Sequence, residues 1–458
     1  MIGLFKKKEQ NVKKDLSNSF NWIKNLDKQK LELSNQDIEK RLSQSKLVHK
    51  FLKSGKGKNL LNSIFLEMID IGFPEISSKI ELDLLIEIFS PETLNQIFFN
   101  PSNGFNNSNH SGIFKQTVQI NEKYGYVVAP KGIVLIVGSS NTILPVITSI
   151  ILSYICGNVS VCQLSRLNKG IIKKFIDGIP SDCNNYVHYI NLDHNVPSDE
   201  NILKELLVQV PWNVINVWGG EEANNFYFKN VAKNLNRPKI INMEPLTGIV
   251  IIQRSYLKNN LNQVSKELSI SISEMGQQLC SSPTEGFIID DTDDYQIDDS
   301  FFKKLVDYLE ENYIEFTDFE SSYFKLDRML TYAQDKNSKV YNSKKYGNKI
   351  SIIVSNKKSV FSDSDDNNHL SIHERRNFLE LINTSNFETL LELIRKINSK
   401  RTHKEIKKVQ TILVFGNKEF NTEILKLAKN IGAYRVIDAN YIFKRHPLEA
   451  LDGIHLVN

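Results

Sequence analysis

The chain has 458 residues, of which 41% are hydrophobic and 24% are charged, and its formal net charge at pH 7 is +4. This composition is typical of a globular protein with two or three domains, and so small a charge does not predict a nucleic-acid partner. The four cysteines form no CxxC pair, and no HExxH motif or Cys/His cluster is present. We therefore expect neither a disulfide framework nor a metal site.

The first hundred residues predict a mostly helical segment. Two runs, SNQDIEKRLSQSKLVHKFLKS and ELDLLIEIFSPETLNQIFF, have helical spacing of apolar residues. SGKGKN, at residues 54–59, predicts a linker, because it lacks the spacing of a phosphate-binding loop. PSNGFNNSNHSG, at residues 101–112, predicts a loop by composition.

No part of the chain predicts export or membrane insertion. The basic start, MIGLFKKKEQNVKKDL, lacks the apolar core and cleavage site of a secretory signal. The most apolar run, residues 143–156, is short for a bilayer and suits a buried helix. We expect a cytoplasmic protein without a transmembrane segment.

From about residue 113, strands and helices alternate. GIVLIV at 132–137 predicts a buried strand, LPVITSIILSYICG a helix with Pro145 in its first turn, and NVSVCQLS at 158–165 a second strand. Such a βαβ unit predicts a parallel sheet. Further strands are expected in YVHYINL (186–192), NVINVWGG (213–220) and KIINMEPLTGIVIIQ (239–253). Polar or glycine-rich loops after these strands predict a ligand site at the carboxyl edge of the sheet, although no GxGxxG is present.

The alternation restarts after residue 280. EGFIID, KISIIVS and VQTILVFG predict strands, and FFKKLVDYLEENY predicts a helix. NTEILKLAKNIGAYRVIDANYIF predicts a helix with a glycine terminator, followed by a short strand. A second α/β lobe is therefore expected.

One cysteine stands in a polar setting between the two lobes. EMGQQLCSSPTEGF, residues 274–287, surrounds Cys280 with Gln and Ser residues, and Pro283 predicts a turn. A reactive thiol needs partial exposure and polar neighbours that favour the thiolate. Cys280 is therefore a candidate nucleophile, with an inert thiol as the alternative interpretation.

Several segments carry a resemblance to the aldehyde dehydrogenase superfamily. APKGIVLIVGSSNTILPVITSIILSYICGNVSVCQLS resembles its Pro-x-Gly, strand, Asn loop, helix, Gly-Asn and strand segment, and EMGQQLCSSP resembles its Gly-Gln-x-Cys nucleophile segment. MEPLTG stands where those enzymes have Glu-Leu-Gly-Gly. NVWGGEEA and LAKNIGAYRVIDANYIFKRHPLEALDG favour the branch of LuxC-type acyl-CoA reductases, the fatty-acyl thioester reductases of bacterial luminescence. Together these pieces cover roughly residues 124–458.

The resemblance implies an α/β fold like that of aldehyde dehydrogenases, with two Rossmann-like parallel-sheet lobes and a mostly helical N-terminal segment. The expected parts are a helical N-terminal segment and linker (1–112), a cofactor-binding lobe (113–262), a catalytic lobe carrying the cysteine (263–435) and a C-terminal return segment (436–458).

The resemblance also implies three catalytic residues. Cys280 matches the nucleophile that would attack a thioester, expel the thiol carrier and hold the acyl group. Asn141 matches the asparagine that, with the backbone N–H of Cys280, resembles an oxyanion hole; a simple turn former is the alternative. Glu244 matches the glutamate that activates water in hydrolytic aldehyde dehydrogenases. Its neighbours Pro245 and Leu246 depart from the family pattern, and a solvent-facing carboxylate is the alternative.

NADP or NAD is the implied cofactor, and five residues match its surroundings. Gln163 stands where the superfamily often has Lys or Arg near the adenosine ribose; a neutral amide can bind hydroxyls but cannot offset a 2′-phosphate. Ser165 would be a neighbouring contact. Gly219 and Gly220, with Glu221, would let the backbone approach the cofactor; a tight turn alone is the other interpretation.

The implied activity is reduction of a long-chain acyl-CoA or acyl-carrier thioester to the fatty aldehyde with NAD(P)H, through an acyl-cysteine intermediate. Two alternatives stay open: an aldehyde dehydrogenase working in the oxidative direction, and a catalytically silent scaffold of the same fold. The implied partners are an acyl-transferring or acyl-protein synthetase protein and further copies of the chain in a homo-oligomer.

Overall fold

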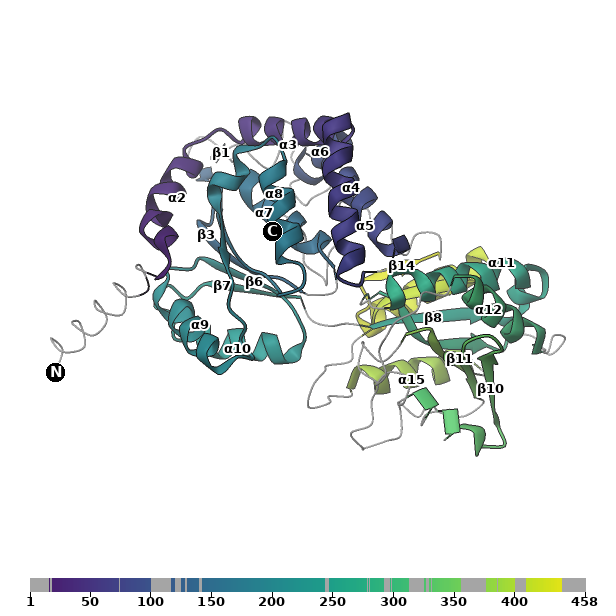
Figure 1. Cartoon of the computed structure of the whole chain (residues 1–458). Coiled ribbons are helices and arrows are strands. Elements are labelled where there is room, and N and C mark those ends of the chain that lie inside the picture. The colour runs from purple at the N-terminus through teal and green to yellow at the C-terminus, as the bar shows by residue number, and fades with distance from the viewer. Residues whose placement is uncertain are drawn as a thin grey trace. The chain divides into compact units, whose positions relative to one another are not determined.

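The computed structural model describes residues 16, 19–73, 75–99, 117–119, 125–127, 130–139, 142–243, 247–277, 279, 281–291, 297, 299–312, 325–326, 329–330, 332–355, 376–384, 386–399 and 409–438. These residues form two compact units, one made of the described residues up to 243 and one of those from 247 onward. Each unit contains one large sheet covered by helices (Figure 1).

The first unit contains a five-stranded parallel sheet of order β5-β4-β3-β6-β7. Its strands are β3 (Ile133–Val137), β4 (Val159–Gln163), β5 (Val187–Ile190), β6 (Val214–Trp218) and β7 (Lys239–Met243). The chain builds outward from β3 to one edge and then from β6 to the other. This doubly wound order places a topological switch between β3 and β6.

Helices cover both faces of this sheet, which is why β3 and β4 are buried at every position. The covering helices are α7 (Leu144–Ile155), α8 (Lys169–Gly178), α9 (Pro197–Gln209) and α10 (Glu221–Val231). In Figure 1, α9 and α10 lie on one side of the sheet, and α7 and α8 on the other. Pro145 stands in the first turn of α7, as the sequence predicted.

The N-terminal helices belong to this first unit. They are η1 (Asn21–Asn25), α2 (Leu26–Ser34), α3 (Ile38–Leu52), α4 (Gly55–Asp70), α5 (Glu75–Ile88) and α6 (Pro91–Phe99). Helices α3 and α5 pack against α7, and α4 packs against α8. Arg41 of α3 is 3% exposed and donates to the backbone oxygens of Ile155 (2.9 Å) and Leu33 (2.9 Å). The helical segment therefore extends the core around the sheet. A short antiparallel pair follows it, β1 (Thr117–Gln119) with β2 (Gly125–Val127).

The linker predicted for SGKGKN is wrong. Helix α4 begins at Gly55, and the Ser54 side chain caps it by accepting from the backbone N–H of Gly57 at 3.3 Å. A Cβ on Gly57 would lie 2.0 Å from the Phe51 carbonyl oxygen. Gly57 therefore permits a close approach of α3 and α4. Glycine disfavours helices, and for this reason the sequence was interpreted as a linker.

The second unit contains a seven-stranded sheet of order β10-β11-β12-β9-β8-β13-β14. Its strands are β8 (Thr247–Gln253), β9 (Pro283–Ile289), β10 (Ser338–Ser343), β11 (Gly347–Ser355), β12 (Phe378–Thr384), β13 (Val409–Phe415) and β14 (Arg435–Ile437). Among the described strands of this sheet, only β10 and β11 pair in antiparallel orientation.

Two helical layers cover the two faces of this second sheet. They are formed by α11 (Arg254–Ser273) with α12 (Asp299–Glu311), and by α15 (Phe387–Ser399) with α16 (Lys418–Ile431). Alternate residues of β8 point into the two layers: Val250 and Ile252 pack with α11 and α12, and Ile249 and Ile251 with α15 and α16. Helix α16 ends at Gly432, with φ of 73°, as its predicted glycine terminator.

The run at residues 239–253 contains the change from one unit to the other. Strand β7 is the last strand of the first sheet, and β8 is a central strand of the second. The change therefore occurs before β8, earlier than the predicted boundary after residue 262. Apolar residues on both sides of the change made the run resemble one continuous strand. The boundaries expected after residues 112 and 435 stay predictions.

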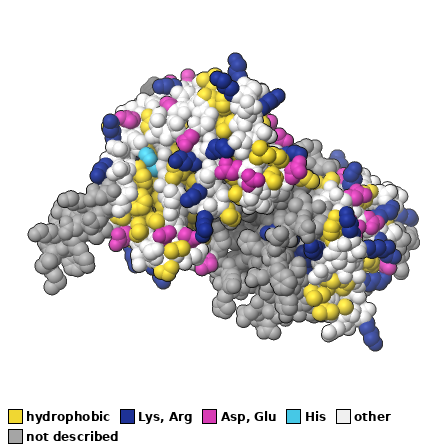
Figure 2. Space-filling view, in the orientation of Figure 1, with side chains coloured by type: hydrophobic (Ala, Val, Ile, Leu, Met, Phe, Trp, Pro, Cys, Tyr) yellow, Lys and Arg dark blue, Asp and Glu magenta, His cyan; other side chains and the backbone are white. Residues whose placement is uncertain are grey.

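The face of the molecule drawn in Figure 2 is mixed in charge. In Figure 2, Lys and Arg side chains are interspersed with Asp and Glu over the visible face. No helix among the described residues is long and apolar enough to cross a membrane.

Candidate functional site

The switch between β3 and β6 brings two glycine-containing loops to the carboxyl edge of the first sheet. Gly138 and Ser139 follow β3, and Gly219 and Gly220 follow β6. The backbone N–H of Gly138 donates to the Gln163 carbonyl at 2.9 Å, and a Cβ on Gly138 would lie 2.9 Å from Val146 Cγ2. Open α/β sheets bind ligands at such a switch point.

The loop after β6 leads directly into α10. Gly220 is the N-cap residue of α10 and supplies no side-chain cap, and a Cβ there would meet nothing within 4 Å. A Cβ on Gly219 would lie 3.0 Å from the Ala223 Cβ, and the Asn224 side-chain amide donates to the Gly219 carbonyl at 2.9 Å. The first N–H groups of α10, which begins at Glu221, are therefore available to an anion.

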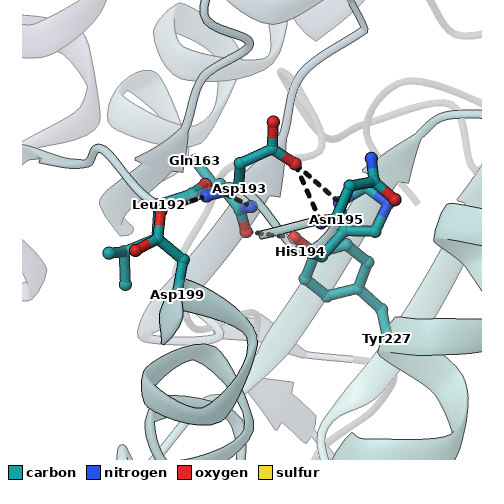
Figure 3. A network of polar contacts seen from close by, with 7 residues as sticks. All are labelled: Gln163, Leu192, Asp193, His194, Asn195, Asp199 and Tyr227. Carbon is teal, nitrogen blue, oxygen red and sulfur yellow. Dashed lines mark hydrogen bonds and ion pairs between the residues drawn. The ribbon is translucent and has the colours of Figure 1, made fainter. Parts of the chain in front are cut away.

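Gln163, at the end of β4, is part of the internal hydrogen bonding of the first unit (Figure 3). It is 5% exposed, its Nε2 donates to the Leu192 carbonyl at 3.1 Å, and its Oε1 accepts from the Tyr227 hydroxyl. Burial raises the pKa of Tyr227, which keeps that hydroxyl protonated as the donor. Gln163 thus joins β4, the loop after β5 and α10. The predicted contact of Gln163 with ribose hydroxyls stays a prediction.

The loop after β5 lies beside Gln163 and has hydrogen bonds of its own (Figure 3). The Asp193 backbone N–H donates to Asp199 Oδ2 at 3.0 Å, and Asp193 Oδ1 accepts from the Asn195 backbone N–H at 2.9 Å. His194 packs its ring against Phe226, with 5.4 Å between ring centroids. These contacts fix the loop that contains Leu192, whose carbonyl accepts from the Gln163 side chain.

Ser165 is hydrogen-bonded to Asn168, and Asn168 binds the backbone of the loop after β3. Its hydroxyl donates to Asn168 Oδ1 at 2.7 Å. Asn168 is fully buried, and its Nδ2 donates to the Ser139 carbonyl at 2.7 Å and to the Thr142 carbonyl at 3.4 Å. The sequence prediction missed Asn168. Its only signal was the spacing Ser-x-x-Asn, which is common in turns.

A buried carboxyl from the N-terminal helices reaches the same segment. Glu81 of α5 is 1% exposed, and its Oε2 accepts from the Ile143 backbone N–H at 3.1 Å. Burial raises the pKa of Glu81 to about 7, and hydrogen bonding to Thr142 and Ile143 partly opposes this rise. Ile143 is the N-cap residue of α7. The sequence prediction also missed Glu81, because nothing in a helical pattern marks which carboxylate is buried.

The segment before position 280 lies at the amino end of β9, in the second unit. Gly276 and Gln277 have φ of 58° and 59°, a region that is strained for glutamine. Gln277 is 1% exposed, and its Nε2 donates to the carbonyls of Pro283 and Phe378, each at 2.7 Å. Its Oε1 accepts from the Phe378 backbone N–H at 2.9 Å.

The segment after position 280 is packed as closely. The backbone N–H of Ser282 donates to the Leu279 carbonyl at 3.0 Å. A Cβ on Gly248 would lie 2.2 Å from the Ser281 carbonyl oxygen, so only glycine fits there in β8. The hydroxyls of Thr247 and Thr284 lie 3.1 Å apart. Hydrogen bonds and close packing therefore hold Gln277 and the residues 281–282, which lie on either side of the predicted nucleophile in the sequence.

The three predicted catalytic residues, Asn141, Glu244 and Cys280, themselves lie outside the described residues. The three described cysteines are unsuited to nucleophilic chemistry. Burial raises the pKa of the Cys156 thiol to about 12, and it also raises those of Cys162 and Cys183. Within the described ranges, no group of three His, Cys, Asp or Glu side chains could hold a metal ion.

The fold has many counterparts among solved structures. It is similar to a succinic semialdehyde dehydrogenase from Streptococcus pyogenes in complex with NADP+, at 15% identity and a TM-score of 0.62, covering 92% of this chain and 86% of that chain. It is similar to a salicylaldehyde dehydrogenase from Pseudomonas putida complexed with salicylaldehyde, at 13% identity and a TM-score of 0.66, covering 93% and 82%. It is also similar to a glyceraldehyde-3-phosphate dehydrogenase from Methanocaldococcus jannaschii complexed with NADP, at 18% identity and a TM-score of 0.58, covering 94% and 86%.

These likenesses confirm the predicted fold class, that of the aldehyde dehydrogenases. No curated protein sequence matches the chain. The sequence matches the family described as acyl-CoA reductase (LuxC) over residues 114–458, which is most of its length. The chain therefore belongs to the acyl-CoA reductase (LuxC) family, a family of oxidoreductases with the aldehyde dehydrogenase fold.

Proposed function

We propose that this protein reduces an acyl-CoA, or another acyl thioester, to the aldehyde through a covalent intermediate on Cys280. The observation that carries the proposal is the family match over residues 114–458. The hydrogen bonds of Gln277 and Ser282, on the two sides of position 280 in the sequence, support it, because a nucleophile must be held at a defined distance from its substrate.

Cys280 is the nucleophile in this proposal. Its thiolate attacks the thioester carbonyl, a new carbon–sulfur bond forms, and the carrier leaves as a thiol after taking up a proton. The raised pKa values of Cys156, Cys162 and Cys183 support the choice, since none of those thiols ionises readily at neutral pH. The strained left-handed conformation of Gln277 supports it too, because such strain gathers at functional sites.

Asn141 is the proposed side-chain donor to the oxygen that becomes negative during this attack. Together with the backbone N–H of Cys280 it would form an oxyanion hole, and one such donor contributes about 3 kcal/mol to the transition state. The hydrogen bonds from Asn168 to the carbonyls of Ser139 and Thr142 support this role. They fix the backbone on either side of Asn141.

NADP or NAD is the proposed cofactor, and when bound it supplies the hydride that reduces the acyl group. Gly219, Gly220 and the first N–H groups of α10, from Glu221 onward, would hold its phosphates. The open space above Gly220 fits such a group, because nothing lies within 4 Å of a Cβ there.

The end of β4 supports a preference for NADP. Arg166 is exposed and follows Ser165 directly. In doubly wound folds, an arginine near the end of the second strand accommodates the 2′-phosphate. We assign Gln163 a positioning role at this end of the sheet, since its amide already bonds to Leu192 and Tyr227. Ser165 likewise acts through Asn168.

Glu244 distinguishes the proposed direction from the oxidative alternative. It follows β7 in the chain, and in this proposal it does not activate water, because hydrolysis would waste the acyl group. Aldehyde oxidation is the second candidate function, favoured by the likeness of the whole fold to aldehyde dehydrogenases.

Nicotinamide absorbance tests the direction. Mixing the protein with a long-chain acyl-CoA and NADPH should lower the absorbance and release free CoA and aldehyde in equal amounts. A rise in absorbance with aldehyde and NADP+, and no reaction with acyl-CoA, would establish the oxidative alternative. No change in absorbance with any acyl donor or aldehyde, in either direction, would favour the catalytically silent scaffold.

A further inference from the structure

One buried carboxyl of the N-terminal helices, that of Glu81, binds the segment between β3 and α7, which carries Asn141. Glu81 lies on α5, outside the residues that match the reductase family. Its carboxyl is 1% exposed and accepts from the backbone N–H of Ile143, two positions after Asn141, at 3.1 Å. Buried carboxyls are uncommon, because losing water costs free energy that only hydrogen bonding or protonation offsets. Such a group therefore calls for a role.

The segment between β3 and α7 is anchored from two directions. On one side, Asn168 binds the carbonyls of Ser139 and Thr142. On the other side, Glu81 binds the N–H of Ile143. Asn141 stands in the sequence between these anchors, so both act on the backbone that carries its side chain.

Glu81 also supplies a hydrogen-bond acceptor at the beginning of α7, where the helix has no side-chain cap of its own. Ile143 is the N-cap residue of α7 and has no side-chain acceptor, and Pro145 has no N–H to donate. A carboxylate is favoured at a helix N-terminus by the helix dipole. Ligand phosphates use such a position in many doubly wound folds, but here the protein's own carboxyl occupies it. This arrangement fits with phosphate binding at α10 instead.

We propose that Glu81 is a positioning residue for acyl transfer: by holding the Ile143 backbone, it sets the position from which Asn141 donates to the reacting oxygen. The proposal rests on the oxyanion role proposed for Asn141. It gives the N-terminal helical segment a part in the reaction. A purely structural cap would stabilise α7 equally well but would have no energetic link to Asn141.

Three substitutions and one control separate these roles. Glu81→Gln keeps an oxygen that can accept from Ile143, Glu81→Leu removes the acceptor at similar size, and Glu81→Asp retracts it by one methylene. Ser78→Ala is the matched control, because Ser78 is fully buried on the same helix and its hydroxyl has no hydrogen-bond partner among the described residues.

Hydrogen exchange tests the anchoring without any activity measurement. In the full-length protein, the peptide covering residues 138–147 should exchange faster in Glu81→Leu than in wild type, and at the wild-type rate in Glu81→Gln and Ser78→Ala. Unchanged protection in Glu81→Leu would overturn the proposal. If Glu81→Leu does not fold, Glu81→Asp takes its place in both experiments.

A double-mutant cycle tests the coupling to Asn141. The single-turnover rate of acylation by palmitoyl-CoA should fall about 10- to 100-fold in Glu81→Leu, as expected for a misplaced catalytic group, with NADPH affinity unchanged. In an Asn141→Ala background the same change should have little further effect. Equal losses in both backgrounds would overturn the proposal and leave Glu81 a helix cap.

The outcomes also separate this proposal from the proposed function. Failure of wild type to form an acyl-enzyme is a failure of the proposed function. If wild type is acylated but Asn141→Ala is acylated equally fast, the oxyanion role of Asn141 fails, and the positioning proposal is overturned with it. Normal exchange or additive losses beside a normal acyl-enzyme are failures of the Glu81 proposal alone.

Discussion

The side chain of Gln277 pairs with the backbone of Phe378 as a neighbouring strand would. Its Nε2 donates to the Phe378 carbonyl at 2.7 Å, and its Oε1 accepts from the Phe378 N–H at 2.9 Å. The same Nε2 also donates to the Pro283 carbonyl. One amide therefore ties the segment before Cys280 to the amino ends of β12 and β9.

Gln277→Ala should lower both stability and the rate of acylation. The change removes three buried hydrogen bonds, each contributing about 1 kcal/mol, so the free energy of unfolding should fall by about 3 kcal/mol. Urea denaturation measures this loss, and single-turnover acylation measures the second effect. Gln263→Ala is the control, because Gln263 is exposed on α11 and bonds to Glu267. Equal stability of the two variants would contradict the account.

Arg166→Ala should change the choice of dinucleotide. Loss of a hydrogen bond to a charged group costs about 1.5 to 3 kcal/mol, so kcat/KM for NADPH should fall about 10- to 100-fold. The value for NADH, which has no 2′-phosphate, should stay the same. Lys173→Ala, which removes an exposed cation on α8, should leave both unchanged. A parallel fall for the two dinucleotides would contradict a 2′-phosphate contact.

The raised pKa of Glu81 makes the stability of the fold depend on pH. Its ordinary value is 4.5, and in the folded protein burial raises the pKa to about 7. Between these values the folded state keeps a proton that the unfolded state releases, so the free energy of unfolding falls as pH rises. This contribution is complete below pH 4.5 and lost by about pH 7, and amounts to about 3 kcal/mol.

Glu81→Gln should remove this dependence. Thermal unfolding at pH 5 and pH 8 should show the variant gaining stability relative to wild type at the higher pH, where wild type holds a buried charge. Ser78→Ala should follow wild type at both values. Curves that stay parallel for Glu81→Gln and wild type would show that this carboxyl does not titrate in the window.

Glu244→Gln should leave the reductase reaction almost unchanged. An acid or base that takes part in a reaction contributes about 100-fold or more to its rate. We expect no such loss in NADPH consumption with acyl-CoA, since no water has to be activated. A loss of that size, accompanied by slower release of free fatty acid from the acyl-enzyme, would favour the oxidative alternative.

The sequence predicted the strand–helix–strand unit from β3 to β4 closely. Strand β3 is a continuous apolar run, three of the five residues of β4 are apolar, and Pro145 and Gly157 mark the limits of the helix. The break between β7 and β8 was missed, because which sheet a strand joins depends on partners far away in the chain. The same reason hid β12, whose neighbours β9 and β11 come from other parts of the sequence.

The site was predictable only where a motif carried it. The polar neighbours of Cys280 made it a candidate nucleophile, whereas Asn141 and Glu244 were proposed only through the resemblance to a family. The role of Gln163 depends on Tyr227, which lies 64 residues further along the chain. Glu81 and Asn168 hold the segment between β3 and α7 through hydrogen bonds to its backbone, one with Glu81 and two with Asn168. Because nearly every residue type carries these backbone groups, the residue types of that segment do not reveal which side chains bind it.

The most direct measurement is the intact mass of the protein after mixing with palmitoyl-CoA in the absence of NADPH. The account predicts a single palmitoyl adduct, located at Cys280 by peptide mapping, absent in Cys280→Ser and removed with release of hexadecanal when NADPH is added. An adduct that persists in Cys280→Ser, or aldehyde formed by that variant, would contradict the central claim.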